Sequence, residues 1–231
     1  VYKGLAIGNN GSADLLYAAN FGLGRVDVFD STFHATTASG GFHDPSLPAG
    51  YAPFDIQNIG GKLYVTYALQ DAAKHDDVAG PGHGFVDVFD LNGNLIQRLT
   101  SQGALNSPWG LAVAPSGFGE FSGDLLVGNF GDGMINAYDS GTGSFLGTLD
   151  NPDGTPIAID GLWGLRFGSG AQGQALDALY FTAGIAGPDQ IEDHGLFGSL
   201  SSTVPEPRPL ILAALGLPLC FLILRRRFRR A

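Results

Sequence analysis

The sequence predicts an all-β protein, a β-propeller built from four-stranded antiparallel blades. Three observations predict this fold: a strand pattern that recurs at a period of about 50 residues, the absence of a helical apolar period, and turn-forming residues between the strands. The period is clearest in the first strand of each unit, where the equivalent positions are 51, 55 and 54 residues apart. These equivalent positions are Gly4, Asp55, Gly110 and Gly164.

The other strands of each unit repeat in the same way. The second strands read LYAANF, LYVTYA, LLVGNF and LYFTAG, and three of the third strands read GRVDVFD, GFVDVFD and GMINAYD. Short runs of β-branched and aromatic residues bounded by turn formers are typical of strands. Asn92-Gly93 predicts a two-residue hairpin between the last two strands of the second unit. We expect the large residues Trp109 and Trp163 to pack between neighbouring blades.

The repeats divide the chain into a propeller domain, residues 1–203, and a tail, residues 204–231. The fourth repeat lacks an outer strand and the first begins at residue 2, so we expect further blades on the N-terminal side. A complete four-bladed ring is the alternative. The blades are expected at residues 2–48, 49–102, 103–152 and 153–203.

The charge of the chain narrows the class of partner. The formal net charge is −10, and residues 1–203 contain 6 Lys and Arg against 21 Asp and Glu. An acidic surface argues against nucleic acid and anionic membrane surfaces as partners. The one cysteine, Cys220, lies in the tail, so the propeller contains no cysteine for a disulfide.

The tail has three features of a membrane sorting signal. A proline-rich segment is followed by an apolar run at residues 210–224 and then by a basic cluster. As a helix this run spans roughly 22 Å, short of a bilayer core of about 30 Å. The basic cluster predicts a cytoplasmic C-terminus with the propeller on the other side of the membrane, and an ordinary single-pass anchor is the alternative. The motif residues are Val204, Pro205, Glu206, Pro207, Arg225, Arg226, Arg227, Arg229 and Arg230.

The tail resembles the PEP-CTERM signal of bacterial proteins that an exosortase processes, and the likeness covers residues 204–231. The body, in runs such as GFVDVFD and NSPWGLAVAP, is similar to an uncharacterised exported family of NHL-like propellers of about six blades. The resemblance implies a Gram-negative bacterium and a transient tether to the inner membrane. It further implies release to the cell surface or the surrounding exopolysaccharide. It implies no catalytic residue.

The sequence contains no recognisable catalytic motif. A nucleophile elbow, a His-Glu-x-x-His zinc motif, a phosphate loop and a cysteine pair are all missing. The aspartates of the third strands recur in several repeats, which favours a structural role because a single site needs one copy. The last aspartate of each of these strands, at Asp30, Asp90 and Asp139, is expected to cap the turn that follows.

Two insertions, residues 69–83 and 185–194, follow the second strands of the second and fourth repeats. In a meander both project from the rim where the first strands begin, and surface loops often carry function. We expect the linker that holds His43 to reach the same rim. The candidate binding residues on this rim are His43, Asp71, His75, His83, Glu192 and His194.

The same insertions predict a metal site. Its candidate ligands are Asp76, Asp77 and Asp193. Oxygen-rich clusters on flexible loops suit Ca²⁺ better than Zn²⁺, so calcium is the candidate cofactor. A pair of solvated acidic loops without an ion is the alternative.

These observations favour a non-catalytic binding module at the cell surface or in the extracellular matrix. Its expected partners are an exosortase-type enzyme, the membrane through the tail, and exopolysaccharide or a surface protein. The alternative is a metal-assisted hydrolase or lactonase with its site on the acidic rim. That alternative requires ligands from at least three blades, and only two insertions are present.

Overall fold

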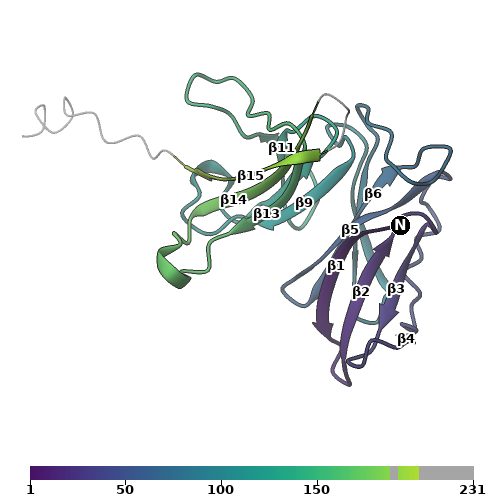
Figure 1. Cartoon of the computed structure of the whole chain (residues 1–231). Coiled ribbons are helices and arrows are strands. Elements are labelled where there is room, and N and C mark those ends of the chain that lie inside the picture. Colours follow the sequence, from purple (N-terminus) through teal and green to yellow (C-terminus); the bar gives the residue numbers. More distant parts are fainter. Residues whose placement is uncertain (188–191, 203–231) are drawn as a thin grey trace, which may run out of the picture.

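A computed structural model describes residues 1–187 and 192–202 of the chain (Figure 1). Its strands form four antiparallel sheets in which neighbours in the sequence are neighbours in the sheet. The first sheet contains β1 (Tyr2–Asn9), β2 (Asp14–Asn20), β3 (Arg25–Phe29) and β4 (Ala35–Thr36). The second contains β5 (Tyr51–Ile59), β6 (Lys62–Leu69), β7 (Phe85–Phe89) and β8 (Leu95–Ser101).

The third and fourth sheets repeat this pattern, with one short 3₁₀-helix in each, η1 (Gly119–Phe121) and η2 (Ala171–Gly173). The fourth sheet has three strands among the described residues. The third sheet contains β9 (Pro108–Val113), β10 (Leu125–Asn129), β11 (Ile135–Tyr138) and β12 (Phe145–Thr148). The fourth contains β13 (Leu162–Phe167), β14 (Ala178–Ala186) and β15 (Glu192–Ser201).

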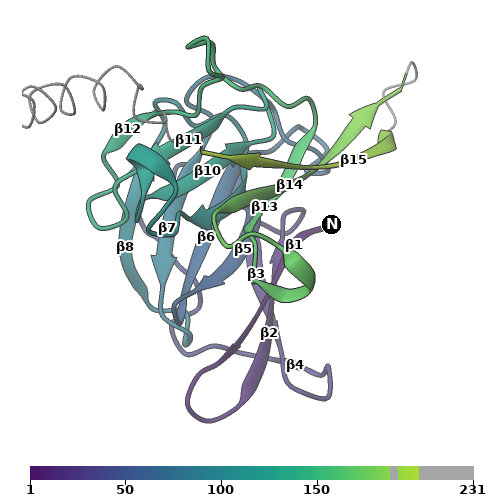
Figure 2. The same ribbon diagram turned by 90° about the vertical axis from the view of Figure 1, so that its left-hand side faces the viewer.

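The sheets are the blades of a β-propeller. Figures 1 and 2 show them packed face against face, with β1, β5, β9 and β13 innermost. The inner strands contact one another in chain order: β1 packs on β5, β5 on β9 and β9 on β13. The predicted all-β propeller with four blades is therefore confirmed.

Each gap between adjacent blades is filled by its own apolar cluster. Tyr17 packs with Ile56 between the first two blades, and Leu126 packs with Leu165 between the last two. A third cluster, which includes Leu111, fills the gap between the second and third blades. Burying one such side chain contributes about 1.5–3 kcal/mol, so these clusters hold neighbouring blades together.

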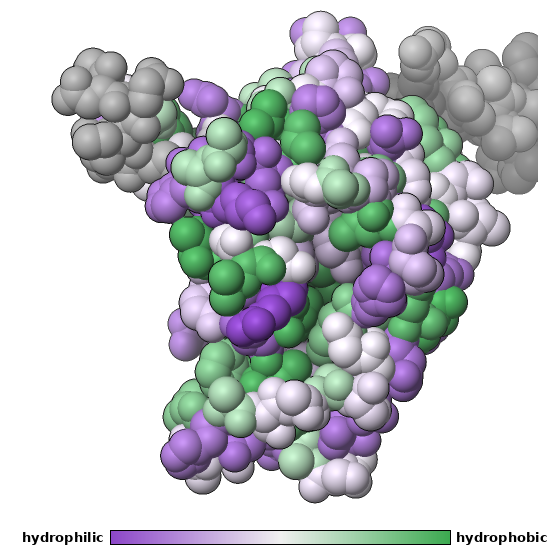
Figure 3. Space-filling model, turned by 90° about the vertical axis from the view of Figure 1, so that its right-hand side faces the viewer, coloured by the Kyte–Doolittle hydropathy of each residue, from purple (hydrophilic) through white to green (hydrophobic). Residues whose placement is uncertain are grey.

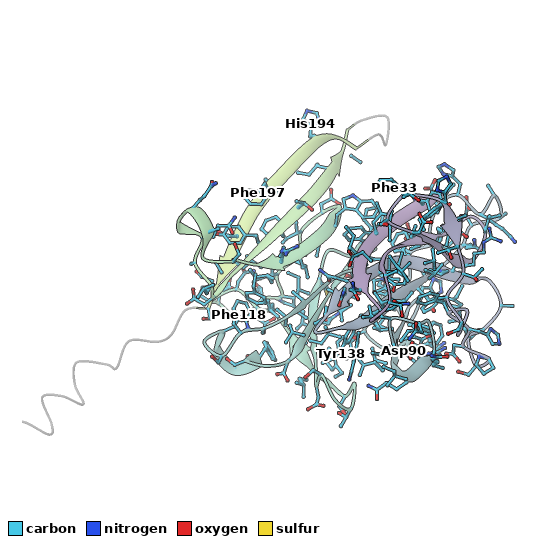
Figure 4. The ribbon with its side chains drawn as sticks, turned by 90° about the horizontal axis from the view of Figure 1, so that it is seen from below. Phe33, Asp90, Phe118, Tyr138, His194 and Phe197 are labelled. Carbon is cyan, nitrogen blue, oxygen red and sulfur yellow. The ribbon has the colours of Figure 1, made fainter. Side chains whose placement is uncertain are left out.

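The repeated aspartates cap the turns, as predicted. Asp90 Oδ1 accepts a hydrogen bond from the Asn92 backbone amide at 2.8 Å, and Asp139 Oδ1 accepts one from Thr142 at 2.7 Å (Figure 4 labels Asp90). The turn at Asn92 differs from the prediction in its length. The Asp90 amide donates to the Asn94 carbonyl, so three residues form the loop, with Gly93 at a φ of 77°. A left-handed third residue is typical of such three-residue hairpins.

Exposed apolar side chains are distributed over the surface. On the face shown in Figure 3, hydrophobic residues form separate patches between hydrophilic ones. The most exposed among the large apolar residues of the inner strands are Leu5 at 63% and Ile7 at 71%, both on β1. These two side chains lie beside the central channel described below.

The tail falls outside this description. The apolar run at 210–224, the motif at 204–207 and the arginine cluster all belong to residues that the structure does not describe. Within the described residues, no helix combines the length and the apolar character needed to cross a membrane.

Candidate functional site

Each inner strand contains a β-bulge at the same position of the repeat. At each bulge the pairing with the second strand skips one residue of the inner strand, or two in β13, where Trp163 and Gly164 are both unpaired. A bulge bends its strand and redirects the side chain of the extra residue, and bulges are common next to functional sites. In each inner strand, a skipped residue directly precedes the position occupied by Gly4, Asp55, Gly110 or Gly164. These skipped residues are Lys3, Phe54, Trp109 and Trp163.

Three of these four side chains form an aromatic cluster. The rings of Trp109 and Trp163 meet edge to face, with centroids 5.4 Å apart and an interplanar angle of 85°. Phe54 lies 6.0 Å from Trp163, and Phe130 lies 4.2 Å from it. Such ring pairs contribute about 0.5–1.5 kcal/mol beyond their buried area. The two tryptophans therefore pack against each other between the third and fourth blades, which confirms the expectation that they pack between neighbouring blades.

Lys3 takes the place of the aromatic residue in the first blade. Its Nζ lies 6.0 Å from the centroid of the Phe54 ring and 3.2 Å from Asp76 Oδ1. This ion pair joins the insertion of the second blade to the inner strand of the first. Since the Asp76 side chain is 62% exposed, the pair contributes little to stability.

Asp55 follows the skipped residue Phe54 and differs from the residue at the same position of the other repeats. The other three blades have glycine there because the inner strands approach closely: a Cβ on Gly110 would lie 2.5 Å from the Trp163 carbonyl oxygen. A Cβ on Gly4 would overlap the Asp55 carboxylate itself. The Asp55 amide donates to Thr66 Oγ1 at 2.9 Å. This bond holds the bulged strand in place beside the carboxylate.

The Asp55 side chain is almost fully buried and has no cation beside it. The residue is 5% exposed, and no Lys, Arg or His of the described chain lies within ion-pair distance of its carboxylate. Burial raises the pKa of Asp55 well above its ordinary value because the charged form loses its hydration.

The inner strands line a channel that consists of two adjoining cavities, both open to solvent. The smaller has a volume of about 350 Å³ and the larger about 650 Å³. Both are lined from all four blades and share the side chains of Leu5, Gln57, Leu111 and Leu165. The smaller cavity adds Lys3, Asp55 and Trp109, and the larger adds Ile7, Val113 and Arg166. Sites for small molecules have volumes of about 300–1,000 Å³ and a mostly apolar lining with a few polar groups.

Two polar atoms of the channel residues are buried without a partner. Gln57 Oε1 and Trp109 Nε1 make no hydrogen bond to any described residue. A buried polar group left unpaired costs about 1–3 kcal/mol, so such groups are rare and need a reason. One is an acceptor and the other a donor, and both residues line the smaller cavity.

The predicted rim residues of the first insertion mostly bind one another. Asp71 Oδ1 accepts from the His75 amide at 2.8 Å, and the His75 ring Nδ1 lies 2.9 Å from Asp76 Oδ2. His83 Nδ1 lies 2.8 Å from the Val78 carbonyl oxygen. These bonds order the loop and use the polar groups that were predicted to face a ligand.

The metal prediction gains no support from this arrangement. Asp76 pairs with Lys3 and His75, and burial raises the pKa of Asp77. Asp193 lies in β15, and its side chain is outside the described residues. Where the chain is described, no group of three or more His, Cys, Asp or Glu side chains could hold a metal ion. A calcium site therefore stays a prediction.

The other predicted rim residues lie apart from the first insertion, in the second insertion and in the linker between the first two blades. Glu192 begins β15, and Figure 4 shows His194 near the projecting end of the β14–β15 hairpin. His43 follows Phe42, whose amide donates to the Gly93 carbonyl at 3.0 Å. Gly93 lies at the end of β7 opposite to the insertion, so His43 is not on the predicted rim.

Sequence reasoning missed the channel residues. Gln57 carries no local signal, because a polar residue in a strand is ordinary. Asp55 did carry one: it is the single acidic residue at a position where the three other repeats have glycine. A break in a repeat marks a position where one copy differs in its role.

No protein-family model matches the chain. Uncharacterized protein R648 of Acanthamoeba polyphaga mimivirus is 38% identical over 205 residues, which are 87% of this chain and 48% of that protein. Uncharacterized protein L690 of the same virus is also 38% identical over 205 residues, 87% of this chain and 51% of its own length. The chain thus spans about half the length of the curated relatives it matches.

Solved structures share the fold. The GH93 α-L-arabinofuranosidase of Fusarium graminearum, solved with arabinobiose, superposes with a TM-score of 0.54 at 13% identity. The match covers 85% of this chain and 57% of that one. A putative gluconolactonase gives a TM-score of 0.49 at 20% identity over 81% of this chain and 60% of its own. At these identities the likeness extends to the fold alone.

The relatives overturn the resemblance inferred from the tail. Membership of a bacterial, exosortase-sorted PEP-CTERM family is wrong, because the curated relatives are mimivirus proteins. The resemblance was based on the composition of the tail. Prolines, a short apolar run and arginines can occur together in a protein that carries no bacterial sorting signal. The expected exosortase and exopolysaccharide partners and the NHL-like family lose their support with it, and export stays a prediction.

Proposed function

We propose that this β-propeller is a non-catalytic binding module whose ligand site is the channel between the inner strands. One observation carries the proposal: the smaller cavity is lined by a buried carboxyl group, Asp55, and by two residues with unpaired buried polar atoms, Gln57 and Trp109. A bound molecule that pairs with these groups would compensate for their cost.

The rest of the lining supports a small-molecule site. Leu5, Leu111 and Leu165 give an apolar wall, and the polar groups are few and come from the first three blades. Binding sites combine apolar area, which supplies affinity, with a few placed polar groups, which supply orientation. The acidic rim, in contrast, already uses its polar side chains in contacts within the loop.

The hydrolase alternative has less to support it. Metal-assisted hydrolysis requires ligands that converge on one ion. Among the residues that the structure describes, no such group of three His, Cys, Asp or Glu side chains exists.

A fragment screen by NMR tests the proposal. The propeller is titrated with a panel of simple amines, carboxylates and neutral sugars at millimolar concentration. We expect at least one class to shift amides of β1, β5, β9 and β13. Replacing Gln57 by Leu should weaken that binding about tenfold, since a lost hydrogen bond contributes roughly 0.5–1.5 kcal/mol.

The matched control is Gln97→Leu. Gln97 lies on β8, the outer strand of the same blade, and donates to the Gly141 carbonyl at 3.3 Å. This variant should bind as the unchanged protein does. Shifts confined to loops or to outer strands, or none from the whole panel, would contradict the proposal.

A further inference from the structure

The channel has one carboxylate at a position where every other blade has none. Glycine at the equivalent positions Gly4 and Gly110 lets neighbouring inner strands touch, and β5 alone places a carboxyl group there. Burying a carboxylate is costly unless a cation or hydrogen-bond donors accompany it. The described residues place no cation within ion-pair distance of Asp55. The Ile56 backbone amide donates a hydrogen bond to the Asp55 carboxylate, but a cation to balance its charge has to come from outside these residues.

The groups around Asp55 favour a cation. Gln57 is two residues further along the same strand, so both side chains lie on one face, at a spacing of about 7 Å. Its unpaired Oε1 is an acceptor and requires a donor. The ring of Trp109 lines the same cavity, and aromatic faces attract cations. An ammonium group offers N–H donors and positive charge to all three.

Resting on the proposed function, we infer that the channel binds a small organic amine, with its ammonium group between the Asp55 carboxylate and Gln57 Oε1. A cavity of about 350 Å³ accommodates an amine of a few carbon atoms. Its alkyl part would contact Leu5, Leu111 and Leu165. Among the described lining residues, an anionic ligand would meet the Asp55 carboxylate, and the cation Lys3 is already paired with Asp76.

The cationic side chains of the described residues do not pair with the Asp55 carboxylate. Lys3 of β1 lines the cavity, but its ammonium group pairs with Asp76 at 3.2 Å and lies over the Phe54 ring. Arg166 of β13 is exposed and lines the larger cavity. The third packed strand, β9, carries no ionisable side chain. The net charge of −10 also attracts cations toward the molecule.

Proton linkage follows from this arrangement. Burial raises the pKa of Asp55, so the unliganded carboxyl group holds a proton at pH values where a free aspartate does not. An ammonium ion binds the ionised form and displaces that proton. Affinity for the amine should therefore rise with pH until Asp55 is ionised in the free protein.

Three probes of one shape test the inference: isobutylammonium, isobutanol and isobutyrate. Each is titrated by NMR into the unchanged protein, into Asp55→Asn and into Asp177→Asn. Asp177 is exposed and precedes β14, so its variant removes the same charge away from the channel. Thermal melts verify that each variant folds.

We expect isobutylammonium to bind most tightly and to shift amides of β1, β5 and β9. Asp55→Asn should weaken it at least tenfold and abolish the rise of affinity with pH, and Asp177→Asn should leave both unchanged. Equal binding of isobutanol or isobutyrate in the channel, insensitive to Asp55→Asn, would overturn the amine inference and keep the channel as a binding site. If none of the three shifts channel amides, the amine inference also fails, and the wider panel decides the proposed function separately.

Discussion

Gly4 packs directly against the Asp55 carboxylate: a Cβ on Gly4 would overlap Asp55 Oδ1. It would also lie 2.7 Å from Asp55 Cα and 2.9 Å from the Ile56 amide nitrogen, so backbone as well as side chain approaches closely. The contact joins the inner strands of the first two blades at the wall of the channel. The geometry of the channel beside Asp55 therefore depends on a glycine in β1.

Replacing Gly4 by Ala should destabilise the propeller by about 1–3 kcal/mol, because the added methyl group forces two backbone segments apart. Denaturant unfolding measures the change. Gly117→Ala is the control, since the nearest atom to its Cβ would be Asp177 Cβ at 4.0 Å. That variant should stay within about 0.5 kcal/mol of the unchanged protein. Equal stability of the two variants would show that β1 and β5 are not in contact at Gly4.

Asp55 should make stability depend on pH. Its pKa is raised in the folded state, so between about pH 4, where an unfolded aspartate ionises, and the folded pKa, the native state holds a proton that the unfolded chain has lost. This contribution is fully present below the unfolded pKa and is lost as pH rises through that window. Asp55→Asn removes the dependence.

The measurement compares melting temperatures of the unchanged protein and of Asp55→Asn from acid to neutral pH. The melting temperature of Asp55→Asn should rise relative to that of the unchanged protein as pH rises. The two melting temperatures should differ least at acidic pH. Comparing the two proteins cancels the contribution of other carboxyl groups, such as Asp77, whose pKa burial also raises. Parallel curves across the whole range would mean that Asp55 ionises normally.

Arg98 should be among the most important charged residues for stability. Its guanidinium pairs with Asp44 and Asp87, and both carboxylates are almost fully buried. Arg98→Met leaves two buried carboxyl groups without their cation, and removing one member of a buried ion pair costs about 3–5 kcal/mol. In denaturant unfolding, this loss of stability should lower the denaturant concentration at the midpoint.

Arg25→Met provides the matched comparison. Arg25 pairs with Asp27 at 2.6 Å, and Asp27 is the repeat equivalent of Asp87, but the Arg25 side chain is 64% exposed. An exposed pair contributes about 0–1 kcal/mol. If the two Met variants lose equal stability, the linker that holds Asp44 is not anchored through Arg98.

The sequence by itself determined the features that depend on neighbouring residues. Strand runs, their turn residues and the aspartates that cap the turns act over a few positions, so the repeats sufficed to predict an all-β propeller with four blades in order. The Asp90 cap and the left-handed Gly93 are local in this sense, although the loop has one residue more than predicted. The tail shows the limit of local composition, because its likeness to a sorting signal was contradicted by the relatives.

The tertiary structure decided what happens at the axis. Lys3 and Asp76 are 73 positions apart, and Gly110 meets Trp163 of the next blade; no local pattern encodes these approaches. The bulges that redirect Phe54 and Trp109 depend on pairing between strands. Charged loop residues were predicted to form the site because they are conspicuous in a sequence. A buried carboxyl group and an unpaired amide oxygen become recognisable only when packing shows that no described cation pairs with the first and no described donor with the second.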